Sequence, residues 1–141
     1  MLIVISILSA EILKLEEDDV EIITSIDFFF TLPCDENCSI LPVMIISAPS
    51  GFNIRVSFNE FIFNGYDSYL EIGDGVDFGR EKRLAYFHGT DIPGDVTSIA
   101  KEAWVKMTSH CAHSIPELKI AVRAVTPKGN RIQIYKAIYM S

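Results

Sequence analysis

The residues best suited to chemistry stand in one short stretch, His110-Cys111-Ala112-His113. A thiol beside imidazoles can act as a nucleophile with its base, or as part of a metal site. Neighbouring strand residues point to opposite faces, so only a loop would bring these side chains together. A nucleophile also needs a group that orients its base and a site for an oxyanion, and no motif supplies either. We therefore expect surface loop residues here, no catalytic residue and no enzyme.

Two further cysteines, Cys34 and Cys38, flank a loop-like stretch where a short local disulfide is geometrically possible. A zinc site is the rival interpretation, but no nearby histidine supplies further ligands. Asn37 begins an Asn-Cys-Ser triplet that matches the N-glycosylation pattern, although such triplets occur by chance and the disulfide would use the same Cys38. The chain has three cysteines, so Cys111 stays a free thiol or pairs outside the chain.

Four carboxylates between positions 67 and 77 offer a second kind of chemistry. Glycosidase-type catalysis needs two of them at a fixed separation, one with a raised pKa in a cleft. These residues are predicted at an outward-facing strand position and in turns. We therefore expect solvated acids on the rim of the fold, where they could contact a basic partner. These candidate binding residues are Asp67, Glu71, Asp74 and Asp77.

The composition is that of one ordinary globular domain. Of the 141 residues, 49% are apolar and 22% are charged. The net charge of −7 repels phosphate backbones, which argues against a nucleic-acid partner. The acidic run Glu16-Glu17-Asp18-Asp19 is short and is followed at once by apolar Val20 and Ile22, so we expect a solvated loop there.

The first ten residues are apolar but too few to span a bilayer, so we expect no transmembrane span of the chain's own. Alternating Ile3, Ile5 and Ile7 fit an extra strand, and an apolar stretch of this length also fits a signal peptide, although no basic residue precedes it. Both interpretations stay open for the segment 1–17.

Alternation with a period of two predicts the elements that would hold these residues. Ile54, Val56 and Phe58 share one parity, which then flips beyond Glu60, as one extra residue in a β-bulge would cause. Other short strands, each bounded by turn residues, are predicted at 43–46, 66–72, 83–87, 103–107, 118–122 and 131–140. The one helical window, 96–102, is too short to nucleate unaided. The fold class is therefore all-β, an antiparallel sandwich, with buried Ile54, Val56, Phe58, Leu70, Ile72, Val105, Met107, Ile120 and Val122.

Four ordered motifs carry a family resemblance. Ala48-Pro49-Ser50-Gly51 precedes the first clear strand, and residues 66–75 read YDSYLEIGDG. Residues 84–93 read LAYFHGTDIP, and Thr97-Ser98 is followed by AWVKMTS at 103–109. Over about 48–125 the chain resembles the CUB domain, a module of complement and tolloid-type proteases and of many cell-surface proteins. The resemblance implies a jelly-roll-like sandwich, spanning 18–126 here, that binds through loops on its rim.

The chain departs from the family at two sites. The second family disulfide would join the position before Tyr66-Asp67 to residue 88, where this chain has Asn64-Gly65 and His88. For the family's calcium site, Asp67 matches the central ligand, but Asn64 and His110 stand near the outer acidic positions. Because calcium needs several oxygen ligands, we expect a site without metal and no cofactor, with calcium the one cation worth testing.

The resemblance implies a non-catalytic extracellular or cell-surface module that binds a protein partner through its rim loops. A carbohydrate-binding, lectin-like sandwich is a separate interpretation. The alternative is a structural or auxiliary subunit of a larger membrane or filament complex. An extra strand at 127–141 favours contact with a partner, because its apolar side chains need cover on both faces. The predicted interface residues are Ile132, Ile134, Tyr135, Ile138 and Tyr139.

Overall fold

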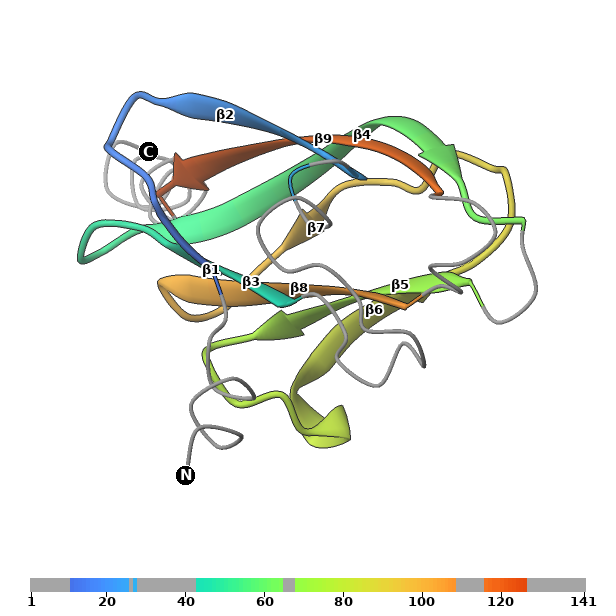
Figure 1. Ribbon diagram of the computed structural model, residues 1–141. Coiled ribbons are helices and arrows are strands. Elements are labelled where there is room, and N and C mark those ends of the chain that lie inside the picture. Colours follow the sequence, from blue (N-terminus) through green and yellow to red (C-terminus); the bar gives the residue numbers. More distant parts are fainter. Residues whose placement is uncertain (1–10, 26, 28–42, 65–67, 109–115, 127–141) are drawn as a thin grey trace, which may run out of the picture.

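The computed structural model describes residues 11–25, 27, 43–64, 68–108 and 116–126, which form two β-sheets stacked face to face (Figure 1). One sheet has five strands in the order β1-β3-β8-β5-β6, and the other has four in the order β2-β9-β4-β7. The strands are β1 Glu11–Lys14, β2 Val20–Thr24, β3 Val43–Ser47, β4 Asn53–Ile62, β5 Tyr69–Asp74, β6 Arg83–Phe87, β7 Val96–Thr97, β8 Glu102–Thr108 and β9 Glu117–Val125. The predicted all-β sandwich is confirmed.

The N-terminal part of the chain contributes a strand to each sheet. β1 pairs with β3 in parallel, whereas every other pair of strands is antiparallel. A turn at Glu16–Asp19, exposed as predicted, then leads to β2 in the opposite sheet. β1 thus lies inside the segment 1–17, while the alternating residues 3–7 lie outside the described residues.

Side chains from both inner faces fill the space between the sheets. All nine core residues predicted from parity are buried, none more than 8% exposed. The predicted bulge in β4 is also present, because the register against β9 shifts between Phe58 and Glu60. The shift turns Phe61 inward, where its ring stacks on Phe63 at 4.6 Å and meets the edge of Phe87 at 6.2 Å.

The window 96–102 is not helical. Val96–Thr97 pairs with β4 as β7, and the Ser98 backbone N–H donates to the Ile54 carbonyl at 2.8 Å. The Ser98 hydroxyl accepts a second hydrogen bond from the Ile54 N–H at 2.8 Å. These backbone groups are therefore used by the sheet, which outweighs a weak local helix preference.

Hydrogen bonds join the segments that the family's second disulfide would link. Phe63 and Gly89 exchange two backbone hydrogen bonds, at 2.7 and 2.9 Å. His88, at the position of the family cysteine, donates from Nδ1 to the Ser68 carbonyl at 2.6 Å. The imidazole thus ties the end of β6 to the residue that precedes β5. Between residues 52 and 125, the described segments contain one helical element, the single 3-10 turn Arg80–Lys82.

Candidate functional site

Many of the predicted site residues lie outside the described residues. These are Cys34, Asn37, Cys38, Asp67, His110, Cys111, His113, Ile132, Ile134, Tyr135, Ile138 and Tyr139. The roles predicted for them therefore stay predictions. Three of the four rim carboxylates are described, and they divide between a loop pair at one end of the sandwich and the outer face of the five-stranded sheet.

Asp74 joins two loops at the end of the sandwich. Its Oδ1 accepts hydrogen bonds from the backbone N–H groups of Ile99, at 2.7 Å, and Ala100, at 3.0 Å. Next to it, the Gly75 N–H donates to the Glu102 carbonyl at 2.9 Å. We call the two loops, residues 74–79 and 98–101, the rim loops. Asp74 is only partly exposed, and its observed interactions position these loops.

The rim loops present apolar side chains to solvent. Val76 is 56% exposed and Ile99 is 80% exposed, the highest value among the described large apolar residues. Asp77 is also exposed, as predicted, and its Oδ1 accepts a hydrogen bond from the Gly79 N–H at 3.0 Å. Hydrogen bonds between and within the two loops thus hold two aliphatic groups and one carboxylate at a fixed place.

The only tryptophan of the chain anchors the first rim loop. Trp104 lies on the outer face of the five-stranded sheet, yet it is only 1% exposed because the 74–79 loop covers it. Its Nε1–H donates to the Asp77 carbonyl at 2.8 Å, and the Phe78 ring meets it edge-on at 5.7 Å. A Cβ on Gly73 would lie 1.8 Å from Trp104 Cε2, so the indole packs where only glycine leaves room.

The placement predicted for Glu71 is wrong. We expected a solvated acid, but its side chain is 10% exposed and pairs with two cations. Arg83 Nη1 lies 3.1 Å from Oε2, and Lys106 Nζ lies 3.7 Å from Oε1. The cause is that β5 is not an edge strand: it pairs with β6 on one side and β8 on the other. Long side chains from both neighbours therefore cover the carboxylate.

Two tyrosines extend this cluster toward the sheet edge. Tyr69 and Tyr86 lie with ring centroids 4.9 Å apart, and the Arg83 guanidinium lies 5.2 Å from the Tyr86 ring centre. Tyr86 is 49% exposed although it packs against both. We call Tyr69, Glu71, Arg83, Tyr86 and Lys106 the outer-face cluster. It presents one more positive than negative charge, an exception on a chain of net charge −7.

Four residues of these sites were not predicted from the sequence: Arg83, Tyr86, Trp104 and Lys106. A signal was available for Trp104 and Lys106, because both alternate with buried residues of β8 and so belong to the outer face. Arg83 and Tyr86 differ in parity, and the register of β6 shifts between Ile72 and Gly73, so alternation alone does not place Arg83. Parity gives the face but not the register, and the register is what places Arg83 and Lys106 around one carboxylate.

The described residues contain neither a group of metal ligands nor a membrane-spanning helix. Among them, no three His, Cys, Asp or Glu side chains gather closely enough to hold a metal ion. No helix in those parts of the chain is long and apolar enough to cross a membrane.

The comparisons with known proteins come from structure alone, because no family model and no curated protein matches this sequence. The CUB2 domain of MASP-1, solved with Ca²⁺ bound, superposes with a TM-score of 0.58 at 16% identity, over 82% of this chain and 98% of that one. The CUB1-EGF-CUB2 region of rat MASP-1 gives 0.56 at 19% identity, over 82% of this chain. The fold is CUB-like.

A longer protein contains a region of similar fold. The full extracellular region of zebrafish Gpr126/Adgrg6 gives a TM-score of 0.56 at 20% identity, over 84% of this chain. This chain spans 15% of that region's length and 43% of the rat MASP-1 chain. The predicted resemblance to CUB domains is therefore confirmed at the level of the fold.

Proposed function

We propose that the chain is a non-catalytic, extracellular CUB-like module that binds a protein partner through the rim loops. The observation that carries the proposal is the rigid presentation of Val76 and Ile99, 56% and 80% exposed, on loops joined through Asp74. Exposed apolar groups on an ordered loop lose little entropy when a partner covers them, which favours binding. The extracellular setting is supported by the similarity of the chain to part of the full extracellular region of zebrafish Gpr126/Adgrg6.

The chemistry of the rim loops also indicates the kind of partner. An aliphatic pair beside the carboxylate of Asp77 fits a surface that offers an apolar recess next to a basic side chain. The acidic charge of the whole chain, −7, would speed the approach of such a partner at low ionic strength.

Binding to whole cells tests the proposal without knowledge of the partner. The chain, tetramerised through a C-terminal tag, is titrated onto cells of several types and binding is read by flow cytometry. We expect saturable binding that V76D and I99D each weaken by about tenfold or more, because each buries a charge in an apolar contact.

Ile92→Asp is the matched control. Ile92 is 59% exposed, a fraction similar to the 56% of Val76. It belongs, however, to the β6–β7 connection, which lies at the opposite end of the sandwich from the rim loops (Figure 1). I92D should bind as the wild type does. Equal losses in I92D and V76D, or no saturable binding by the wild type on any cell type, would contradict the proposal.

A further inference from the structure

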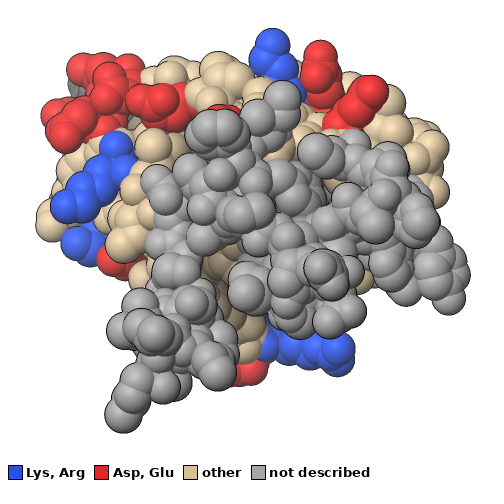
Figure 2. Space-filling model, viewed as in Figure 1, with Lys and Arg blue, Asp and Glu red and all other residues tan. Residues whose placement is uncertain are grey.

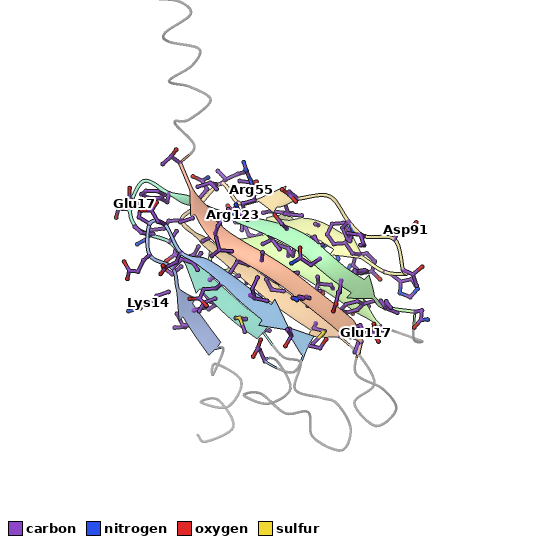
Figure 3. All side chains as sticks on the ribbon, turned by 90° about the horizontal axis from the view of Figure 1, so that it is seen from above. Lys14, Glu17, Arg55, Asp91, Glu117 and Arg123 are labelled. Atoms are coloured by element: carbon purple, nitrogen blue, oxygen red, sulfur yellow. The ribbon has the colours of Figure 1, made fainter. Side chains whose placement is uncertain are left out.

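The outer face of the four-stranded sheet carries two arginines directly opposite each other. Arg55 in β4 is the register partner of Arg123 in β9. The same row of the sheet continues to Val20 in β2 and to Thr97 in β7. Both arginines are exposed, and Figure 3, which views this side, labels them next to each other.

Neither arginine has an acidic partner within the described part of the chain. The ion pairs there join Glu71 to Arg83 and Lys106 only, and the contact recorded for Arg55 is a 3.5 Å hydrogen bond from Nε to the Thr97 hydroxyl. Like charges directly opposite each other on a sheet are destabilising. A chain with 19 acidic and 12 basic residues thus leaves this pair without a counter-charge on its own sheet row.

The opposite charge lies beside this row. The exposed turn Glu16–Asp19 leads directly into Val20, the register partner of Arg123. Figure 2 shows acidic side chains gathered over the β1–β2 turn, and Figure 3 labels Glu17 at the same end of the sheet as Arg55 and Arg123. An anionic patch and a cationic pair are therefore neighbours, and Val20 and Ile22 on β2, 49% and 47% exposed, form an apolar strip beside them.

We propose that this face binds a second copy of the chain. A two-fold axis that passes beside Val20 would place the acidic turn of each copy against Arg55 and Arg123 of the other. The apolar strips would meet at the axis. In such an interface one patch is used twice, so the surface must be complementary to itself. Adjacent patches of opposite charge around an apolar strip meet that requirement.

The size of the face sets the expected strength. The strands β2, β9, β4 and β7 have five, nine, ten and two residues. With strands about 4.8 Å apart and a rise of about 3.3 Å per residue, they give a face of about 400 Å² per copy. That is at the low end of specific interfaces, so we expect a reversible dimer with a Kd of about 10 to 100 μM. Residues next to the arginines are small, Ser57 and Ala121, which leaves room for acidic side chains of the partner copy.

Complementary charge reversal tests the proposal. Variant A carries R55E and R123E, and variant B carries E16K, E17K, D18K and D19K. Each alone brings like charges together at both contacts, so sedimentation equilibrium should show monomers, with dimerisation weakened by about tenfold or more. A mixture of A and B restores opposite charges at both contacts and should form a one-to-one heterodimer.

The control variant is K82E, which reverses one charge in the turn before β6 of the other sheet. It should dimerise as the wild type does. Circular dichroism establishes that A and B are folded. A wild-type chain that stays monomeric up to about 1 mM would overturn the proposal. So would a mixture of A and B that sediments as monomers, or a variant A that dimerises as the wild type does.

Discussion

Gly73→Ala is expected to displace the only tryptophan. The added Cβ would lie 1.8 Å from Trp104 Cε2 and 2.0 Å from Cζ2, far inside van der Waals contact. Residue 73 in β5 is the register partner of Trp104 in β8. Because the two backbones are joined in the sheet, the backbone at residue 73 cannot easily move away from the indole. The indole must therefore leave its place under the 74–79 loop.

The magnitude follows from what the indole loses. The hydrogen bond to the Asp77 carbonyl contributes about 1 kcal/mol, and the edge-on contact with Phe78 about 1 kcal/mol more. Exposing half of the ring, about 100 Å², costs about 2.5 kcal/mol. The total of about 4.5 kcal/mol is a large share of a typical domain's stability. It would lower the urea midpoint by about 2 M.

Tryptophan fluorescence measures both effects, because Trp104 is the only tryptophan. We expect G73A to shift the emission to longer wavelength in the native state and to lower the urea midpoint. Gly94→Ala is the matched control, since a Cβ there meets nothing within 4 Å and the midpoint should not fall.

A double-mutant cycle separates steric conflict from a general intolerance of alanine. In a Trp104→Ala background, followed by circular dichroism, Gly73→Ala should cost less than about 0.5 kcal/mol because the clash is gone. If G73A costs as much there as in the wild type, or leaves the wild-type fluorescence and midpoint unchanged, the packing argument is refuted.

Four further outcomes are expected. Glu71→Gln should destabilise by about 1 to 3 kcal/mol, because Arg83 and Lys106 lose their shared carboxylate while staying partly solvated; a urea midpoint equal to the wild type would contradict this. His88→Ala should cost about 1 kcal/mol through the lost hydrogen bond to Ser68, and an unchanged midpoint would show that this bond contributes nothing. Mild reductant should leave the near-UV circular dichroism signal largely intact, since hydrogen bonds join the segments that the family's second disulfide would link. A cooperative loss of the signal would show that the fold depends on a disulfide. Calorimetric titration with calcium should show weak binding or none, and a micromolar Kd that Asp67→Ala removes would count against a degenerate site.

The faces of β4, β8 and β9 could be predicted from sequence because apolar residues alternate clearly along these strands. Ile54, Val56 and Phe58 share a parity, and the flip beyond Glu60 located the bulge without any structure. Local composition also placed the turns. What local pattern did not reveal is how strands distant in sequence align, and the site depends on that alignment.

Glu71 illustrates this limit. Parity correctly put it on the outer face, but exposure depends on which residues lie across from it in β6 and β8, more than ten positions away in sequence. Trp104 shows the same: alternation puts it on the outer face, yet a loop from another part of the chain buries it. β7 was missed because two residues are too few to show a period.

The place of β9 in the four-stranded sheet governs the order in which the molecule can be completed. β9 lies between β2 and β4, and it pairs Val20 with Arg123 and Asn53 with Val125. A ribosome makes the chain from its N-terminus, so β2 and β4 leave the exit tunnel well before the strand that joins them. Until residues 117–125 emerge, both strands have open edges, the condition in which nascent β-proteins aggregate. Pairings this distant in sequence also fold slowly. Synthesis of this chain should therefore depend on protection of its first half by chaperones.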